Sequence, residues 1–348
     1  MRIFLSGNAG FIGFHVSREL LKKNYYVVGL DNFSTGKIQN SLDLQEEFED
    51  HFEQHTGSIN DTKLVMKLMK DCDKVIHLAA IPRISKSIKY PKNTAMVNII
   101  GTINILKCAA ESGIKKLVFS SSSSVYGDSL KPLKEDSFKY PNNPYGLQKW
   151  SAEQFCKYYS EKHDLDITIL RYFNVYGERQ SPDSGAVIPS FIYGILKNDS
   201  VKIYNGTQIR SYVYVDDVAY ATRLAIESKG FNIFNIAGQR SYTVNDIFTR
   251  ITREIGRPSE VFYLPMQKSD RKNSIANTNH VNNELGFSPF VIIERGIQNV
   301  VDYIRTEYIE EKERWEKKQR LVSQKIIHSV ITVKKSIVVF HLMALARW

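Results

Sequence analysis

The chain has 348 residues and a formal net charge of +10, and 43% of its residues are hydrophobic. This length allows one large or two modest domains, and the composition is that of a globular protein. The positive charge comes without basic motifs interleaved with aromatics, so we predict no nucleic-acid partner. Three scattered cysteines have neither metal-ligand spacing nor disulfide density, which predicts no metal site and a reducing, cytoplasmic location.

A glycine-rich turn follows the first predicted strand, which covers residues 2–6. The turn runs from Gly7 to Gly13 with the pattern G-x-x-G-x-x-G, and residues 14–23 then show apolar positions at helical spacing. A strand–turn–helix unit directs backbone N–H groups and the positive end of the helix at a pyrophosphate, and the glycines let the backbone come close. Because the strand begins at the second residue, we predict no signal peptide.

A second predicted strand, residues 25–31, ends in the carboxylate of Asp31. A carboxylate about 20 residues beyond the glycine turn accepts hydrogen bonds from the adenosine ribose and repels a 2′-phosphate. This arrangement favours NAD over NADP. The alternative is that Asp31 is only a turn residue at the end of the strand.

Two further buried strands are predicted at residues 74–80 and 116–122. His77 lies within the first of them, and this position favours a core histidine over an acid–base group. The second strand runs into five serines, Ser120 to Ser124. Ligands of open α/β sheets bind at the carboxyl ends of strands, so these serines are candidates for a binding site.

Tyr145 and Lys149 lie four residues apart on a helix predicted to begin near Asn143, so both point to one face. A free tyrosine titrates at about pH 10, which is too high for a base at neutral pH. A nearby ammonium and the positive charge of an oxidised nicotinamide would both lower that pKa. The pair therefore predicts proton transfer at an alcohol carbon.

These motifs resemble the extended short-chain dehydrogenase/reductase superfamily, and within it the NAD-dependent nucleotide-sugar 4-epimerases. The resemblance covers residue 1 to about residue 305 in order. It is carried by the glycine turn, DNFSTG at 31–36, the serines before VYG at 125–127, the Tyr-x-x-x-Lys helix, RYFNVYG at 171–177, GTQIRSYVYVDD at 206–217 and FNIAG at 234–238.

The resemblance implies which residues form the site. The catalytic residues are expected to be Tyr145, Lys149 and, by its spacing from residues 125–127, Ser122. The residues expected to contact NAD are Gly7, Gly10, Phe11, Ile12, Gly13, Asp31, Asn32, His77, Leu78, Ala79, Ala80, Asn98, Tyr145, Lys149 and Phe173. Those expected to bind the UDP-sugar are Ser122, Asn174, Val187, Ile188, Tyr204, Arg210 and Ser274.

The resemblance also implies the architecture, a Rossmann-like α/β fold with a doubly wound parallel sheet. Residues 1–174 are expected to bind NAD, with 210–237 crossing back to them, and 175–305 to form a smaller α/β substrate-binding lobe. Helices near 94–112 and 145–163 resemble those that dimerise this superfamily, which predicts a homodimer. Residues 306–348 lie outside the resemblance, are charged and then apolar, and have no apolar run of the ~20 residues that a transmembrane segment needs.

Departures from the family pattern narrow the expected reaction. Related 4,6-dehydratases have an acid pair directly after the catalytic hydroxyl, and nucleotide-glucuronate decarboxylases have a glutamate there. Here those places hold Ser123 and Ser124, which disfavours both reactions. Gln267 stands where the family has the arginine of R-x-G-D, so another cation is expected to replace that phosphate contact, and the candidates are Lys268, Arg271 and Lys272.

The choice of sugar depends on two positions. Ser274 is small where family members restricted to plain hexoses are often bulky, which leaves room for an N-acetyl group. Arg83 lies in a loop where it could meet a uronate carboxylate, or could be an exposed loop charge. We therefore predict reversible C4 epimerisation of UDP-glucose/galactose or of the N-acetylhexosamine pair. The alternatives are a UDP-glucuronate 4-epimerase, another nucleotide-sugar oxidoreductase or decarboxylase, and a non-catalytic NAD-sensing protein.

Overall fold

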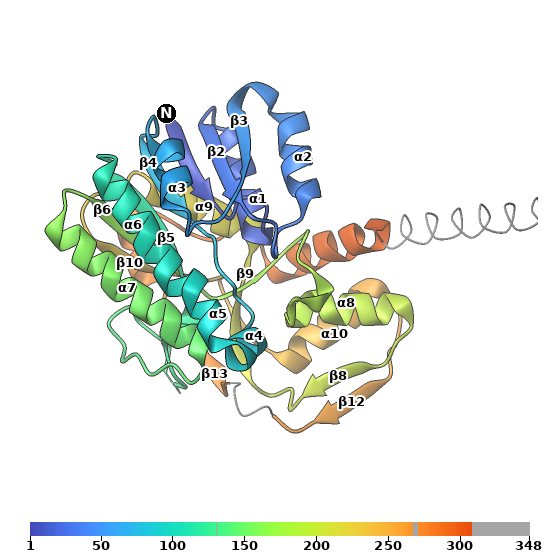
Figure 1. The fold of residues 1–348 in the computed structure, drawn as a ribbon. Coiled ribbons are helices and arrows are strands. Elements are labelled where there is room, and N and C mark those ends of the chain that lie inside the picture. The colour runs from blue at the N-terminus through green and yellow to red at the C-terminus, as the bar shows by residue number, and fades with distance from the viewer. Residues whose placement is uncertain (130, 267–270, 308–348) are drawn as a thin grey trace, which may run out of the picture. The chain divides into compact units, whose positions relative to one another are not determined.

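A computed structural model of the chain describes residues 1–129, 131–266 and 271–307. Its central sheet has seven strands in the order β10-β6-β5-β4-β1-β2-β3, and every neighbouring pair is parallel (Figure 1). This topology confirms the predicted doubly wound α/β fold. The strands are β1 Arg2–Ser6, β2 Tyr26–Asp31, β3 Phe52–Thr56, β4 Lys74–His77, β5 Lys116–Ser122, β6 Asp166–Tyr172 and β10 Asn232–Ile236.

Both faces of this sheet are covered by helices, so its strands are apolar on both sides. Along β1, Ile3 and Leu5 belong to one core cluster, whereas Phe4 between them belongs to the other. The first cluster includes side chains of α1 Phe11–Leu21, α2 Ile38–Glu47 and α9 Val215–Ala225. The second includes side chains of α3 Thr62–Met69, α6 Thr102–Glu111 and α7 Pro144–Lys162 (Figure 1).

Two element boundaries differ by three residues from the sequence prediction, and both lie beside the glycine turn. Helix α1 begins at Phe11 rather than at residue 14, directly after Gly10, which has extended backbone angles (φ −71°, ψ 171°). Strand β4 ends at His77 rather than at residue 80, because its partner strand β1 ends opposite it at Ser6. The next strand, β5, has the predicted bounds.

The helix predicted near residues 94–112 is divided into three parts. A short helix α5 (Pro91–Ala95) leads into a π-helical turn (Met96–Gly101), and α6 follows. The helix α4 (Ile84–Lys89) precedes them. A π-helical turn inside a helix often marks a functional region. Here the turn contains Asn98, whose side-chain amide is engaged with the loop after β4.

Smaller sheets form the part of the molecule predicted to bind substrate. Strand β9 (Ile209–Tyr214) pairs with β7 (Asn174–Tyr176), β11 (Ser241–Thr243) and β13 (Asn273–Ser274). Strands β8 (Val201–Tyr204) and β12 (Val261–Leu264) form a separate parallel pair next to α8 (Val187–Lys197) and α10 (Val244–Ile255). A further helix, α11, spans Asn279–Leu285. Strand β10 returns to the central sheet beside β6.

By its internal contacts the chain divides into one compact unit, Met1–Val301, and a second, Asp302–Trp348. The proposed division of the first unit at residue 174 therefore stays a prediction. Residues 308–348, which contain most of the charged and apolar tail, lie outside the described residues. Among the helices that the structure describes, none is long and apolar enough to cross a membrane.

Candidate active site

Helix α7 places Tyr145 and Lys149 on one face, as predicted. The helix begins at Pro144 because the side chain of Asn143 accepts a hydrogen bond from the Gly146 backbone N–H at 2.9 Å. The Tyr145 backbone N–H is also satisfied, by the Ser87 hydroxyl at 3.1 Å. The position of the phenol is therefore fixed by the cap of its own helix and by a residue of α4.

Ser122 is the last residue of β5, and its hydroxyl lies close enough to the Tyr145 phenol to act on the pKa of that group. Burial raises the pKa of Tyr145 to about 12, and the Ser122 hydroxyl acts in the opposite direction. The structure thus joins the serine and the tyrosine that the sequence predicted to act together. With these residues alone, burial dominates and the phenol is protonated at neutral pH.

Lys149, one helical turn after Tyr145, is also buried. Its ammonium donates to the Ser120 carbonyl at 2.8 Å and lies 4.8 Å from the centre of the Phe119 ring. Burial lowers the pKa of Lys149 to about 8, while Glu153 acts to raise it. The lysine is therefore held by β5 rather than by the phenol, and a cation at this position favours an anion nearby.

The glycine turn has the geometry of a cradle. Gly7 has a φ of +82°, and a Cβ there would lie 2.6 Å from the backbone nitrogen of Ala79. A Cβ on Gly13 would lie 1.9 Å from the Gly7 carbonyl oxygen, so α1 packs closely on the turn. Within the described residues no side chain caps α1 at Gly10, and its first turn has no acidic residue. The free N–H groups of that turn suit the pyrophosphate of a dinucleotide.

Asp31 lies beside this turn, at the end of β2. Its carboxylate accepts hydrogen bonds from the backbone N–H groups of Ala9 at 3.1 Å and Phe33 at 2.8 Å. Burial raises the pKa of Asp31, and these backbone hydrogen bonds oppose that effect. The neighbouring Asn32 is exposed and accepts from the Ser34 N–H at 3.1 Å. The carboxylate is therefore oriented by the glycine turn itself, and its contact with a ribose stays a prediction.

Two of the residues expected to contact NAD, His77 and Asn98, have side chains that are hydrogen-bonded within the protein. The His77 imidazole is completely enclosed between the hydroxyls of Ser6 at 2.7 Å and Thr102 at 3.0 Å. Burial lowers the pKa of His77 to about 3, so the ring is neutral. The Asn98 side chain binds the backbone of Ile81 and the side chain of Gln148. These contacts stabilise the end of β4 and the loop that follows it. A ligand can therefore contact the backbone of that loop rather than these two side chains.

Two arginines meet near the serine-rich end of β5. Arg271 donates to the Ser123 carbonyl at 2.7 Å and lies 3.3 Å from its hydroxyl. Arg210 in β9 donates to the backbone carbonyls of Ile209, Arg271 and Lys272. The structure thus brings Arg271, one of the candidate replacements at the R-x-G-D position, next to the predicted phosphate ligand Arg210. Gln267 and Lys268 lie outside the described residues.

The other residues predicted to bind substrate differ in their exposure and in their partners. Asn174 donates to the Ser211 carbonyl at 3.0 Å, and Tyr204 is partly exposed. Val187 begins α8, whereas the Ile188 side chain is buried in the core. Ser274 is also completely buried, and its hydroxyl has no hydrogen-bond partner among the described residues. Ser274 therefore does not border open surface, where an N-acetyl group was expected to fit. Its role in substrate binding stays a prediction.

A buried ion pair below the site was not predicted from the sequence. Arg171 in β6 binds Glu153 of α7 through two hydrogen bonds of 2.9 and 2.7 Å, and both side chains are almost completely buried. Glu153 also accepts from Ser121 at 2.5 Å, and Arg171 donates to Tyr126 at 2.7 Å. These contacts thus join α7 to β6 and to the end of β5. The sequence feature that could have indicated this ion pair is Glu153, which lies one helical turn beyond Lys149.

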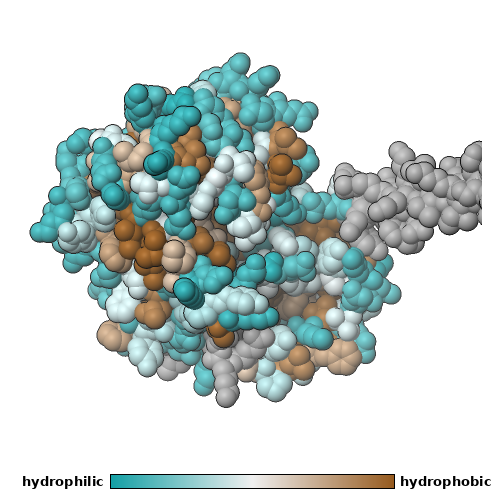
Figure 2. Space-filling view, viewed as in Figure 1, coloured by the Kyte–Doolittle hydropathy of each residue, from teal (hydrophilic) through white to brown (hydrophobic). Residues whose placement is uncertain are grey.

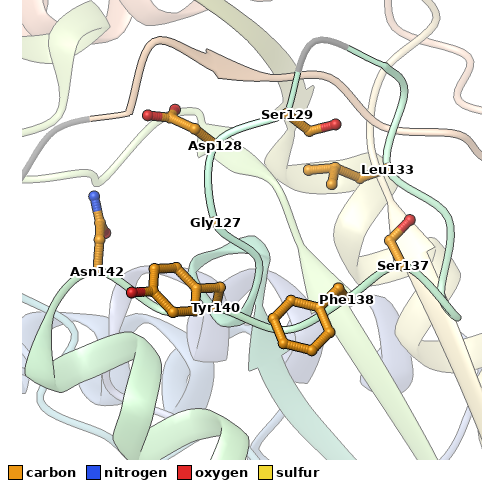
Figure 3. A pocket seen from close by; sticks show the side chains of 8 residues that line it. All are labelled: Gly127, Asp128, Ser129, Leu133, Ser137, Phe138, Tyr140 and Asn142. Carbon is orange, nitrogen blue, oxygen red and sulfur yellow. The ribbon is translucent and has the colours of Figure 1, made fainter.

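A cavity of about 350 Å³ lies beside the serine-rich end, in the loop that follows it (Figure 3). The rings of Phe138 and Tyr140 stack at its edge with their centres 6.4 Å apart, and both are largely exposed. As far as the described residues show, none of the predicted site residues lines it. Its lining is Gly127, Asp128, Ser129, Leu133, Ser137, Phe138, Tyr140 and Asn142.

Comparisons with known proteins place this chain in a family of enzymes. Residues 3–237 match the family model described as the NAD dependent epimerase/dehydratase family. A putative UDP-glucose 4-epimerase of Methanocaldococcus jannaschii is 37% identical over 308 residues, which cover 87% of this chain and 98% of that protein.

Solved structures agree with this assignment. The UDP-glucose 4-epimerase of Thermotoga maritima with UDP-glucose superposes with a TM-score of 0.83 at 35% identity, over 88% of this chain and all of the other. The UDP-glucuronic acid 4-epimerase of Bacillus cereus, in complex with UDP-glucuronic acid and NAD, gives a TM-score of 0.83 at 33% identity, with the same coverage.

Proposed function

The chain is an enzyme of the NAD dependent epimerase/dehydratase family, and we propose that it reversibly inverts C4 of a UDP-hexose. NAD is the cofactor of this family. The observation that carries the proposal is that Ser122, at the carboxyl end of β5, lies beside Tyr145 of α7, while Lys149 of the same helix is bonded to the β5 backbone at Ser120. The glycine turn follows β1 of the same sheet. This arrangement would supply an alcohol-binding hydroxyl, a base and a cation at the end of the sheet where ligands of open α/β sheets bind.

The chain's own residues perform the proton transfer. Ser122 holds the 4-OH of the sugar, and the Tyr145 phenol takes its proton as C4 is oxidised to a ketone. Bound NAD supplies the acceptor for the C4 hydride and a positive ring charge that favours the phenolate. Lys149 adds a second positive charge, and together these offset the burial that raises the pKa of Tyr145. Tyr145 would return its proton to the 4-keto oxygen when the rotated sugar is reduced on its other face, which completes the inversion.

The serines after the catalytic hydroxyl support epimerisation over elimination. Ser123 and Ser124 are both buried, and Ser123 is bound by Arg271. A dehydratase needs an acid and a base where these hydroxyls stand, because elimination moves a proton from C5 and protonates the leaving hydroxyl. Epimerisation also needs no net redox change, so turnover should leave no NADH. Stoichiometric NADH formation with substrate would instead indicate a dehydrogenase.

A uronate substrate is the second candidate, favoured by one residue. Arg83 stands at the N-cap position of the short helix α4, in the loop after β4, without a capping hydrogen bond from its side chain, and is only partly exposed. A guanidinium there suits a sugar carboxylate, and the B. cereus relative is described as acting on UDP-glucuronic acid. Incubation with UDP-glucose, UDP-N-acetylglucosamine and UDP-glucuronate, with product analysis, distinguishes the candidates. Turnover of UDP-glucuronate alone, lost in Arg83→Ala, would overturn the hexose preference and leave the 4-epimerase proposal intact.

The assembly we propose is a homodimer through α5–α7. Figure 2 shows apolar side chains gathered on the face that carries these helices. The exposed members include Met96, Ile100, Phe155 and Tyr158, of which the last two lie on α7. A contiguous apolar surface of this kind commonly marks a protein contact. Sedimentation of Ile100→Glu tests the proposal, since a charge there should shift a dimer towards monomer, and an unchanged species would contradict it.

A further inference from the structure

Arg179 has an unusual backbone conformation just after β7, the first strand of the smaller sheets. It follows β7 by three residues, and its φ is +65°. This left-handed conformation costs a residue with a Cβ about 1–2 kcal/mol. Such strain persists only where surrounding contacts impose it, and it concentrates at functional positions. The contacts of the side chain are therefore informative.

The Arg179 guanidinium is held by helices of the nucleotide-binding part. It lies 3.8 Å from the centre of the Phe14 ring in α1. It also pairs with Asp43 of α2 at 2.6 Å and donates to the Asn40 side chain at 2.9 Å. Stacking and a planar fork of donors are properties of arginine that lysine lacks. One side chain thus ties α1 and α2 to a segment 139 residues away.

Asn40 continues this connection to the glycine turn. It is almost completely buried, and its amide donates to the Ala9 carbonyl at 2.9 Å. The Ala9 N–H donates in turn to the Asp31 carboxylate at 3.1 Å. A hydrogen-bonded chain therefore runs from Arg179 through Asn40 and Ala9 to Asp31. Its far end is the carboxylate predicted to bind the ribose.

The residues before Arg179 reinforce the same attachment. The Glu178 carbonyl lies 3.2 Å from His15 Nε2 in α1. Gly177 packs so closely that a Cβ would lie 2.3 Å from Val215 and 3.5 Å from the Phe11 ring. Residues 177–179 are thus seated along α1, the helix whose N-terminus faces the predicted pyrophosphate site.

We propose that Arg179 is a positioning residue for NAD, which keeps the glycine turn and Asp31 in their binding geometry through Asn40. It does not touch the reacting atoms. The proposal depends on the family's use of NAD and is independent of which sugar is the substrate. The test therefore measures NAD binding without any sugar.

The main variant is Arg179→Met, which keeps an unbranched side chain and removes the charge and the hydrogen bonds. NAD is titrated into the nucleotide-free protein, and we expect about tenfold weaker binding, within the range that residues acting through others produce. Saturating NAD should then restore kcat, because the catalytic residues are untouched. The matched control is Arg18→Met, which removes the exposed Arg18–Glu47 pair between the same two helices and should leave the affinity unchanged.

A second variant, Arg179→Gly, separates positioning from folding. Glycine adopts the observed φ without strain, so the melting temperature should fall little, while NAD binding should weaken as in Arg179→Met. Two results would overturn the proposal. One is an NAD affinity within twofold of the parent in both variants, and the other is an equal loss in Arg18→Met.

Discussion

Strand β5 has a buried lysine at each end, and burial lowers the pKa of both ammonium groups to about 8. Lys116 begins the strand and donates to the hydroxyls of Thr168 at 2.6 Å and Ser228 at 3.0 Å. Lys149 lies at the other end and donates to the Ser120 carbonyl. By burial and pKa alone the two lysines cannot be told apart.

What separates them is the end of the sheet at which they lie. Crevices that bind ligands in parallel α/β sheets open at the carboxyl ends of strands. Lys149 lies at the carboxyl end of β5, one helical turn from the Tyr145 phenol beside Ser122. Lys116 is at the amino end, where its ammonium donates to two hydroxyls and where the carboxylates of Asp166 and Glu227 act to raise its pKa. A perturbed pKa therefore indicates function only when the topology also supplies a place for a substrate.

The largest expected effect comes from removing the phenol at the carboxyl end. Tyr145→Phe keeps the ring packing and deletes the proton acceptor, so epimerisation should fall about 10²–10⁴-fold, with NAD binding nearly unchanged. Turnover of UDP-sugars measures the first and titration the second. A variant as fast as the parent would falsify the proposed mechanism.

Removing the lysine at the same end should cost less. Lys149→Met deletes the positive charge that we propose favours the phenolate. A neighbouring opposite charge shifts a pKa by about 1–3 units, so activity should fall about 10- to 10³-fold. The loss should be smaller at high pH, where the phenol deprotonates more readily. A pH–rate profile of variant and parent checks this, and identical profiles would contradict a role for the ammonium.

The matched substitution at the amino end tests the comparison directly. Lys116→Met should leave turnover unchanged and raise the free energy of unfolding at pH 7 by about 1–3 kcal/mol. The folded-state pKa of about 8 lies below the ordinary 10.5, so the parent is destabilised below pH 8. As pH rises from 8 to 10.5 the folded state loses this proton first, and the difference between variant and parent should shrink. Denaturant unfolding at pH 7 and pH 10 measures it.

The smallest effect is expected one residue earlier. Lys115 pairs with Asp164, and both side chains are mostly exposed. Exposed pairs contribute about 0–1 kcal/mol, so Lys115→Ala should change the unfolding free energy by less than about 1 kcal/mol at either pH. A change as large as that of Lys116→Met would show that charge, and not burial, dominates at this end.

Much of the fold could be predicted because its signals are local. The bounds of β5 and the start of α7 after Asn143 depend on residues a few positions apart. The comparisons confirm the family that the ordered motifs indicated. The π-helical turn at Met96–Gly101 was missed, because it depends on where Asn98 meets the loop after β4.

The sequence by itself determined the glycine turn and the spacing of Tyr145 and Lys149, because periodicity and turn chemistry act within one element. The resemblance of its ordered motifs to a known family indicated the parallel α/β fold. Only the tertiary structure decided the Glu153–Arg171 pair, the Arg179 connection to Asn40 and the contrast between Lys116 and Lys149. These features join side chains from different strands and helices. Their energies come from burial and from partners that the folded chain brings together, and neither is visible along the sequence.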